Sequence, residues 1–287
     1  MRTTGKRRLK QHKTRRTVLE IIKNKALLLK LRHPKQVTTA IPKSHKVDDN
    51  NVLVKWGVDE SHVLKNLNIK VPSPIKGQYD WPGQHKPFEH QKETSAFLTM
   101  NRKAFCFNEQ GTGKTASAIW ASDFLMKQGA IKRVLVICPL SIMDSAWRSD
   151  LFSFAMHRSV DIAYGSPDKR RKIIDGGAEY VIINYDGVAI VKDDIANGGF
   201  DLIIVDEATH YKNAQTTRWK TLNKILKPDT WLWMMTGTPA AQSPLDAYGL
   251  AKLINPTEVP RFFGSFRDMV MYKVSNFKWI PKDTAIS

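Results

Sequence analysis

The chain has 287 residues, 42 % of them hydrophobic, which is enough to bury the core of one large domain or two modest ones, so a wholly disordered chain is excluded. No apolar run reaches the roughly 20 residues that span a bilayer, and the charged N-terminus is not followed by the apolar stretch of a signal peptide. A membrane-spanning or secreted protein is therefore excluded and a cytoplasmic one is expected, while the net charge of +18 points to a polyanionic partner.

The first 46 residues form a basic arm. They hold fifteen lysine and arginine side chains against the single acid Glu20, which is a net charge of +14. Each such cation that meets a phosphate releases a condensed counterion, so the arm is expected to contact nucleic acid. A solvated tail is the alternative interpretation.

Apolar residues recur at near-helical spacing within this arm and stop before Pro34, which predicts a basic amphipathic helix over about 14–32. These residues are Val18, Ile21, Ile22, Leu28 and Leu29. Such a helix would lie on nucleic acid, on a membrane surface or on the chain's own main domain, and the sequence does not choose among the three.

A small segment follows the arm. The run NVLVKW (51–56) predicts a strand, and residues 59–67 predict a helix whose N-cap is Asp59 or Ser61. Proline and glycine then crowd residues 72–87, which is typical of a connector to a new unit.

From Pro87 onward, short apolar runs alternate with helical stretches. The expected strands are KAFCF, RVLVIC, SVDIAY, EYVIIN, DLIIVD and TWLWMM. The expected helices are 114–127, 143–154, 167–175, 215–226 and 244–254, with a loop after EYVIIN. Runs that are apolar on both faces and separated by helices predict an α/β fold with a parallel sheet covered on both sides. Cys106 and Cys138 lie inside two of these runs and are expected to be buried free thiols.

The stretch NEQGTGKT, residues 108–115, joins the first of these strands to the first of these helices. Its glycines free the backbone, Lys114 can reach phosphate, and the Thr115 hydroxyl is placed to hold Mg²⁺. A strand that feeds such a turn into a helix aims backbone N–H groups and the helix dipole at phosphates. Asn108 replaces the first glycine of the GxxxxGK[ST] pattern, and a chance glycine-rich turn is the alternative. The prediction is a nucleoside triphosphate site.

The stretch DLIIVDEATH supplies a second half of this site. Asp206 and Glu207 follow four apolar residues, at the carboxyl end of the sheet where open α/β folds bind ligands. Asp206 can hold magnesium through its waters, and Glu207 can orient or deprotonate the water that attacks the γ-phosphate. An acidic pair in a solvated turn is the alternative, which the position downstream of a phosphate loop disfavours.

Several motifs occur in order over about Pro87 to Pro256. On them the chain resembles superfamily 2 helicases and translocases, within these the SWI/SNF branch, and particularly the short helicases that bacteriophages encode. The stretches similar to the glutamine motif and to motifs I, Ia, Ib, II and III are PFEHQ, NEQGTGKT, ICPLSIMDSAW, VIINYDGV, DEATHYKN and TGTPAAQSPLDAYGLAKLINP. The resemblance implies a RecA-like lobe that uses ATP and Mg²⁺ and moves on DNA, in the host cytoplasm if a phage encodes it.

The resemblance also assigns roles to individual residues. Gln91 would contact adenine, although an exposed polar residue at a helix start is the alternative. The nucleotide would further be held by Glu109, Gln110, Gly111, Thr112, Gly113, Lys114 and Thr115, with Mg²⁺ at Thr115 and Asp206. The nucleic-acid backbone would run along Pro139, Leu140, Ser141, Asn184 and Tyr185. The coupling of ATP state to the track would fall to Thr236, Gly237 and Thr238, and catalysis to Lys114, Asp206 and Glu207.

Side chains near these motifs have competing interpretations. Phe88 is expected in the core rather than under adenine, and Trp147 is expected to pack against the sheet rather than on bases. Tyr185 stays open between packing and base stacking. His210 sits one place after the position where the family usually has His or Asp, and Thr209 takes that place, so His210 is left out of the catalytic set.

Helicases of this kind use two RecA-like lobes with ATP between them, and the second lobe supplies arginine fingers. After Pro256 about thirty residues remain, which is too few for a further domain, and neither Arg261 nor Arg267 sits in a motif VI pattern. The chain is therefore interpreted as a basic arm with an amphipathic helix (1–46), a small accessory segment (47–86), a first lobe (87–256) and the start of a connector toward a second lobe (257–287).

Two hypotheses about function follow. In the first, the chain is the first motor lobe of an ATP-dependent DNA helicase or translocase, completed by a second lobe in trans. In the second, it is a basic nucleic-acid-binding module, or a truncated helicase fragment, that hydrolyses essentially no ATP. A neighbouring reading frame with a QxxGRxxR-like motif would favour the first. The residues alone do not distinguish DNA from RNA, but the resemblance favours DNA.

Overall fold

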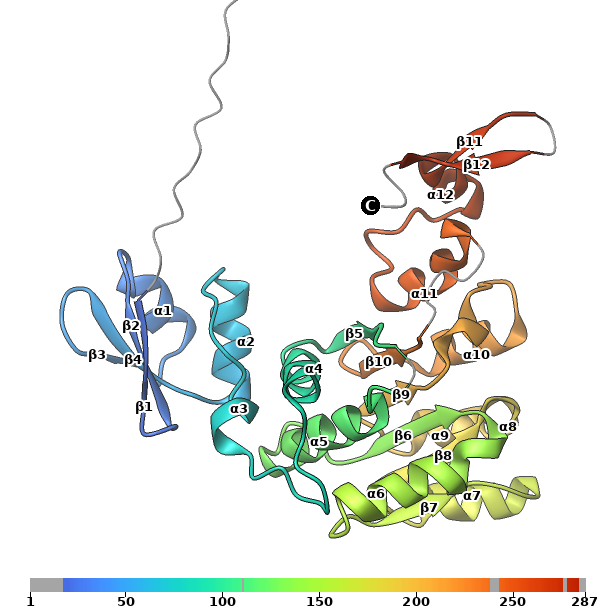
Figure 1. Ribbon diagram of the computed structural model, residues 1–287, viewed down its shortest axis with the longest axis horizontal. Coiled ribbons are helices and arrows are strands. Elements are labelled where there is room, and N and C mark those ends of the chain that lie inside the picture. The colour runs from blue at the N-terminus through green and yellow to red at the C-terminus, as the bar shows by residue number, and fades with distance from the viewer. Residues whose placement is uncertain (1–17, 110, 238–242, 276–277, 284–287) are drawn as a thin grey trace, which may run out of the picture. The chain divides into compact units, whose positions relative to one another are not determined.

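The computed structural model describes most of the chain, namely residues 18–109, 111–237, 243–275 and 278–283 (Figure 1). The chain divides into two compact units, residues 1–72 and residues 73–287. The boundary expected after residue 46 thus falls inside the first unit, and the one expected after residue 86 falls inside the second.

The first unit contains a four-stranded antiparallel sheet in the order β1-β2-β4-β3. Its elements are β1 (Val18–Ile22), β2 (Ala26–Lys30), α1 (Pro34–Ala40), β3 (His45–Lys46), β4 (Asn51–Lys55) and α2 (Val58–Asn66). Leu27 and Leu29 of β2 and Val52 and Val54 of β4 are fully buried and form one core cluster with Trp56. This alternation with a period of two is the pattern of strands that bury one face.

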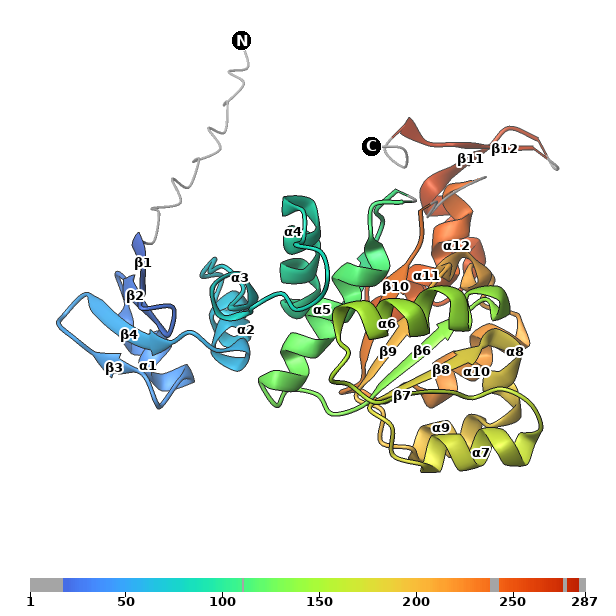
Figure 2. The ribbon, with the colours of Figure 1, turned by 60° about the horizontal axis from the view of Figure 1, so that its bottom comes forward.

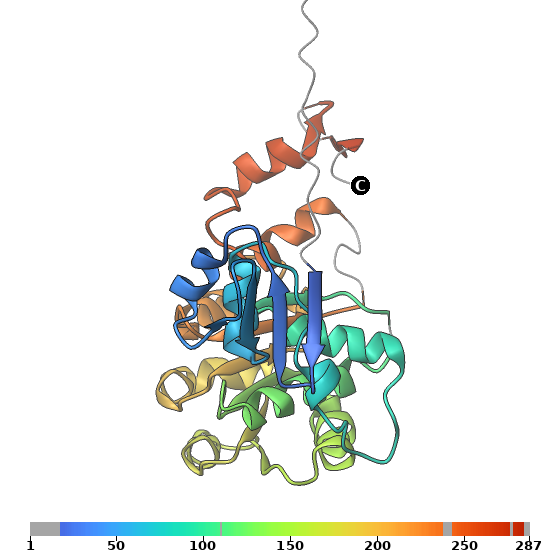
Figure 3. The same ribbon diagram turned by 90° about the vertical axis from the view of Figure 1, so that its left-hand side faces the viewer.

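The helix predicted over 14–32 is wrong in its described part, which forms the β1–β2 hairpin (Figure 3). Lys23 and Asn24 both have positive φ, 50° and 53°, and the N–H of Lys25 donates to the carbonyl of Ile22 at 2.9 Å, as in a type I′ turn. β2 then pairs with β1 on one side and with β4 on the other. The hydrogen bonds between β2 and β4, a strand beyond residue 46, favour the extended conformation here. The spacing of apolar residues within 14–32 does not reveal this pairing.

The remaining predictions for this unit are largely confirmed. The strand expected at 51–56 is β4, and the helix expected at 59–67 is α2. The N-cap is Gly57, so neither Asp59 nor Ser61 caps the helix. Asp59 lies in the first turn instead, where its charge favours the positive end of the helix dipole.

The second unit is built on a six-stranded parallel sheet in the order β5-β10-β9-β6-β8-β7. Its strands are β5 (Lys103–Cys106), β6 (Val134–Cys138), β7 (Val160–Ile162), β8 (Tyr180–Asn184), β9 (Leu202–Val205) and β10 (Trp231–Met235). Figure 2 shows α5 (Lys114–Lys127) and α6 (Ser149–Phe154) on one face of this sheet, and α7 (Pro167–Asp175), α9 (Lys192–Asn197) and α10 (Thr217–Ile225) on the other. The predicted α/β fold is confirmed.

Further helices precede, connect and follow these strands. They are α3 (Ile75–Gln78), α4 (Glu89–Thr99), α8 (Tyr185–Ile190), α11 (Ala247–Ile254) and α12 (Phe263–Val270). Short 3-10 turns are η1 (Leu140–Ile142), η3 (Ala208–Tyr211) and η4 (Pro244–Asp246), and η2 (Met143–Arg148) is a stretch of π-helix. A hairpin ends the described chain, with β11 (Met271–Lys273) and β12 (Trp279–Pro281).

Every residue of β6, β9 and β10 is buried, as expected for strands covered on both faces. The loop expected after EYVIIN is wrong, because α8 and α9 follow β8 there. Val188, Val191 and Ile195 of this stretch are buried in the core on one face of the sheet. Cys106 and Cys138 are buried free thiols, as predicted, and burial raises the pKa of Cys138 to about 12. No helix in the described part of the chain is both long and apolar enough to cross a bilayer.

The stretch expected as a connector, residues 72–87, packs on the large sheet unit from residue 73 onward. The Tyr79 hydroxyl donates to the buried carboxylate of Asp123 at 2.6 Å, and the Trp120 indole N–H donates to the carbonyl of Pro82 at 2.8 Å. Asp123 also accepts from Nε of Arg158 at 2.7 Å. Hydrogen bonds to a buried charge tie this stretch firmly to α5.

Candidate nucleotide and nucleic-acid site

The loop between β5 and α5 has a backbone that glycine adopts most easily. Gly111 and Gly113 have φ angles of 78° and 76°. A Cβ atom on Gly113 would lie 2.1 Å from Nε2 of Gln91, so a larger residue would strain the backbone and displace that amide. Gly113 is also the N-cap of α5, and the first turn of a helix offers unpaired N–H groups to phosphates.

Lys114 begins α5 and turns back over this loop. Its ammonium donates to the carbonyl oxygens of Asn108 and Glu109, both at 2.9 Å. Asn108, which stands where the pattern has glycine, donates from Nδ2 to Oγ1 of Thr94 on α4 at 2.8 Å. The departure from the pattern therefore anchors the loop to α4. Gln110, a predicted contact, lies outside the described residues.

The start of α4 lies against the same loop. Oε1 of Gln91 accepts from the N–H of Phe88 at 3.0 Å, and Nε2 donates to the carbonyl of Thr112 at 3.2 Å. Gln91 is buried, so it is not the exposed polar residue of the alternative interpretation. An amide has two donor hydrogens and two acceptor lone pairs, so one of each is still free for a further partner.

Phe88 and His90 lie at the surface, just before Gln91 in the chain. Phe88 is 68 % exposed, so the expectation that it is a core residue is wrong. Its ring stacks nearly parallel on that of His90, with 5.7 Å between centroids. Nε2 of His90 lies 3.0 Å from the carbonyl oxygen of Thr112, so this aromatic pair is fixed beside the loop.

Asp206 follows β9 and is buried. Its Oδ2 accepts from the indole N–H of Trp147 at 2.9 Å, and its Oδ1 accepts from the N–H of Glu207 at 3.0 Å. Burial raises the pKa of Asp206, while these two hydrogen bonds and the charge of Lys114 act in the opposite direction. Because a desolvated carboxylate gains most from a nearby cation, this position favours metal binding.

Glu207 takes up a backbone conformation that is rare for a residue with a side chain. Its φ and ψ are 50° and 56°, in the left-handed region. The Tyr185 hydroxyl donates to the carbonyl of Asp206 at 2.5 Å, directly before this turn. Backbone strain of this kind persists only where the surroundings fix it, and it clusters at functional sites.

Two aromatic residues that support Asp206 were not predicted to do so. Trp147 is fully buried, so the expectation that it packs rather than stacks on bases is confirmed. Tyr185, which the sequence left open, is buried as well. They lie 59 and 21 residues from Asp206 along the chain, and no local pattern relates them to it.

Replacing Trp147 with phenylalanine is expected to lower the free energy of unfolding by about 2–4 kcal/mol, because it leaves a cavity and removes a hydrogen bond from a buried carboxylate. Trp233→Phe is the matched control, since Trp233 is also fully buried but donates to the neutral backbone carbonyl of Asn101 at 3.0 Å. Urea unfolding should show the larger loss for Trp147→Phe. Equal losses in the two variants would mean that the Trp147 indole acts through packing alone.

The segments expected along nucleic acid lie next to each other. Cys138 at the end of β6 pairs with Asn184 at the end of β8, so the residues that follow share one edge of the sheet. Leu140 is 52 % exposed and Ser141 is exposed, whereas Oδ1 of Asn184 accepts from Nη1 of Arg170 at 3.1 Å. The residues of η1 are therefore accessible at the surface, whereas the side chain of Asn184 is held by its hydrogen bond from Arg170.

Thr236 and Gly237 follow β10, the strand between β5 and β9. Thr236 is fully buried, and its N–H donates to the carbonyl of Cys106 at 3.1 Å. The end of β10 therefore lies between the two halves of the candidate nucleotide site. Thr238, the third residue expected there, lies outside the described residues.

His210 is exposed on η3. Its ring packs on that of Tyr185 with 4.6 Å between centroids, and Nδ1 lies 3.4 Å from Nη1 of Arg218. Within the described chain these contacts place it beside Tyr185, on the side of the edge expected to meet nucleic acid.

The donor set fits Mg²⁺ with a bound nucleotide. The described residues contain no group of three or more His, Cys, Asp or Glu side chains that could hold a metal ion by themselves. Mg²⁺ in nucleotide sites takes one or two protein ligands and completes its shell with phosphate oxygens and water. The Thr115 hydroxyl in the first turn of α5 and the Asp206 carboxylate are ligands of that kind.

Comparisons with known proteins agree with this geometry. The profile of the SNF2-related domain family matches residues 90–276. The chain is 28 % identical over 185 residues to a Xenopus laevis protein named SWI/SNF-related matrix-associated actin-dependent regulator of chromatin subfamily A-like protein 1, covering 63 % of this chain and 18 % of that protein. It is also 28 % identical over 158 residues to putative protein p41 of Acyrthosiphon pisum secondary endosymbiont phage 1, covering 52 % of this chain and 34 % of that one.

A solved structure shares the fold. The Sulfolobus solfataricus SWI2/SNF2 ATPase core in complex with double-stranded DNA superposes with a TM-score of 0.58 at 23 % identity, over 66 % of this chain and 39 % of that chain. The resemblance read from the motifs is thereby confirmed for the fold and the family. The chain, with its glycine-rich loop and its Asp206-Glu207 pair at one edge of a parallel sheet, belongs to the SNF2-related domain family.

Proposed function

We propose that the chain is the first motor lobe of an ATP-dependent DNA helicase or translocase. The observation that carries the proposal is geometric. Lys114 follows β5 and the buried Asp206 follows β9, and these two strands pair in parallel with either side of β10, so both side chains start from the same edge of the sheet. A cation and a desolvated carboxylate at one sheet edge are the two parts that a Mg²⁺–triphosphate complex needs.

Each residue of this site has a distinct task in the proposal. Lys114 leaves the carbonyls of the loop and donates to the β- and γ-phosphates, which are stronger acceptors because they are charged. Thr115 and Asp206 would hold Mg²⁺, partly through water, and the ion would neutralise charge on the phosphates. Glu207 orients the attacking water and accepts its proton.

The adenine would be read beside α4. Gln91 has one donor hydrogen and one acceptor lone pair beyond its present contacts, which suits the edge of adenine. The exposed stack of Phe88 and His90 offers an aromatic face next to it. The remaining loop residues would hold phosphate through the backbone; they are Glu109, Gln110, Gly111, Thr112 and Gly113.

Nucleic acid would lie along the edge formed by Pro139, Leu140, Ser141, Asn184 and Tyr185. The Sulfolobus relative of the same fold was solved with double-stranded DNA, which favours DNA as the track. Trp147 and Tyr185 support the proposal, because each joins a segment at this edge to Asp206 by a hydrogen bond. Thr236, Gly237 and Thr238 would relate the nucleotide state to the track.

A second RecA-like lobe would close the nucleotide cleft in trans and supply arginine side chains to the γ-phosphate. The chain spans between 12 % and 34 % of the length of these curated relatives. The activity of a complete two-lobe motor is therefore part of the proposal. The cytoplasm is the proposed location. A basic nucleic-acid-binding module without turnover of its own is the second candidate, which the net charge of +18 favours.

The test is steady-state ATP hydrolysis by the purified chain with and without duplex and single-stranded DNA. Where turnover is present, Glu207→Gln is expected to lower it about 10²–10⁴-fold without weakening Mg-ATP binding, because a general base is lost and the phosphate contacts remain. Lys114→Ala should weaken Mg-ATP binding strongly and remove turnover. DNA binding without turnover above these variants would favour the second candidate until a second lobe restores hydrolysis.

A further inference from the structure

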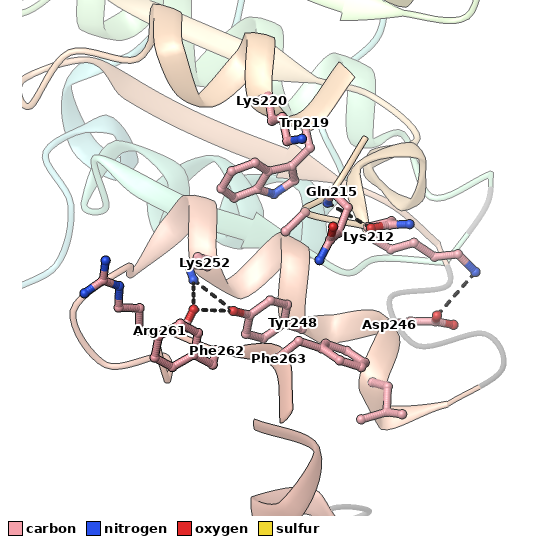
Figure 4. Close-up of a pocket in the computed structure, with 13 residues that line it drawn as sticks. Lys212, Gln215, Trp219, Lys220, Asp246, Tyr248, Lys252, Arg261, Phe262 and Phe263 are labelled. Atoms are coloured by element: carbon pink, nitrogen blue, oxygen red, sulfur yellow. Dashed lines mark hydrogen bonds and ion pairs between the residues drawn. The ribbon is translucent and has the colours of Figure 1, made fainter. Parts of the chain in front are cut away.

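A concave site that none of these roles uses lies in the second unit (Figure 4). Its volume is about 740 Å³, within the range of sites that enclose drug-sized ligands. The walls come from four stretches, namely residues 212–215, 219–220, 245–252 and 261–263. We call this site the α11 groove.

Hydrogen bonds to backbone carbonyls join the walls of the α11 groove. The indole N–H of Trp219 donates to the carbonyl of Gly249 at 2.8 Å, and the N–H of Gly249 donates to the carbonyl of Lys212 at 3.1 Å. A Cβ atom on Gly249 would lie 2.2 Å from that same carbonyl oxygen, so only glycine permits this approach. The Tyr248 hydroxyl donates to the carbonyl of Arg261 at 2.8 Å and fixes the opposite wall.

Most cations in the lining of the groove form no ion pair within the described chain. It contains one carboxylate, that of Asp246, and this lies 3.3 Å from the ammonium of Lys212. In the part of the chain that the structure describes, no carboxylate forms an ion pair with the other three cations of the lining. They are Lys220, Arg261 and Lys252, and of these Lys252 donates to the Tyr248 hydroxyl at 2.8 Å and to the carbonyl of Arg261 at 2.5 Å.

Beside these cations lies an exposed apolar surface. Phe262 is 67 % exposed and Phe263 is 43 % exposed. Trp219 and Tyr248 are nearly buried, and the Arg261 guanidinium lies over the ring of Phe262 at 5.5 Å. A single nucleic-acid strand stacks successive bases on several open ring faces, whereas two of the four rings here are buried and Arg261 lies over a third, so this surface suits apolar side chains better.

We propose that the α11 groove docks an acidic-apolar peptide segment of a partner protein. Apolar side chains of the segment pack on Phe262 and Phe263, and its carboxylates meet Lys220, Lys252 and Arg261. The groove wall at Lys212 follows directly after η3, so an occupant would touch the chain that continues from Glu207. This interaction goes beyond the proposed motor function and requires no nucleotide.

The test is fluorescence anisotropy of the full chain with a labelled eight-residue probe in which Phe and Leu alternate with Asp and Glu. Lys220→Glu, Arg261→Glu and Phe262→Ala are each expected to weaken binding about five- to tenfold. Two matched controls should leave it unchanged. Lys224→Glu reverses another exposed charge on α10 outside the groove, and Phe152→Ala removes an equally exposed ring, also 67 %, from α6.

Three outcomes would overturn the proposal. Equal weakening in groove variants and controls would mean that the probe follows overall charge. Equal affinity for a probe in which glycine replaces Phe and Leu would remove the apolar part of the argument. Displacement of the probe by an oligo(dT) strand whose own binding is weakened by Phe262→Ala would assign the groove to nucleic acid. Lys114→Ala, which tests the motor function, should bind the probe normally.

Discussion

Replacing Lys114 with alanine is expected to lower the affinity for Mg-ATP about 10- to 100-fold, because one charge-assisted contact to phosphate contributes about 1.5–3 kcal/mol. The fold should be retained, since the ammonium donates only to two loop carbonyls that can turn to water. Titration calorimetry with Mg-ATP measures the first effect, and thermal unfolding without nucleotide measures the second.

Lys92→Ala is the matched control for this variant. Lys92 is a partly exposed lysine on the neighbouring helix α4, and its ammonium lies 3.3 Å from Glu89 within the same turn. Mg-ATP affinity should be unchanged in this control. If Lys114→Ala bound Mg-ATP as tightly as the unaltered chain, the loop between β5 and α5 would not be the phosphate site.

A chain that consists of residues 73–287 is expected to lose about 100-fold in affinity for duplex DNA at low salt, with a shallower dependence of affinity on salt. Residues 1–72 carry eighteen Lys and Arg against five Asp and Glu, so they hold most of the net positive charge. Because the β1-β2-β4-β3 sheet runs across residue 46, a cut there would break it. The cut therefore follows Pro72, where the two compact units divide.

Fluorescence titrations over a series of salt concentrations measure this effect. The slope of log Kd against log salt should fall by several units, about 0.9 for each lost phosphate contact. The shortened chain should bind Mg-ATP as before, since its nucleotide loop and Asp206 lie within one unit with its own core. An unchanged slope would show that the first unit does not contact nucleic acid.

The candidate nucleotide site could be predicted from the sequence because its signals are local. Glycines at positive φ, a lysine at the first position of a helix and an acidic pair after a buried strand each occupy a few consecutive residues. The strands of the large sheet could also be predicted from the sequence, because strands buried on both faces have unbroken apolar runs, such as those of β6 and β9. α5 covers Lys114–Lys127, as its pattern predicted.

The sequence failed where distant partners decided the local structure. Residues 18–30 have an apolar spacing that suits a helix, yet they form a hairpin because β4 pairs with β2 and buries Leu27 and Leu29. The same reason explains α8 and α9. The sequence after β8 predicts a loop, but apolar residues of this stretch are buried against the sheet, and this packing favours helices.

By itself, the sequence determined the family and the parallel α/β sheet, and it predicted the residues that would face ATP, because each of these depends on a pattern within one strand, one turn or one helix. The tertiary structure alone decided what surrounds these residues. It brings the Trp147 indole to Asp206, exposes the Phe88 ring beside Gln91 and gathers four stretches around the α11 groove. The exposure of a ring and the contacts between segments tens of residues apart, such as that of Trp147 with Asp206, depend on how the chain packs, and no local preference encodes them.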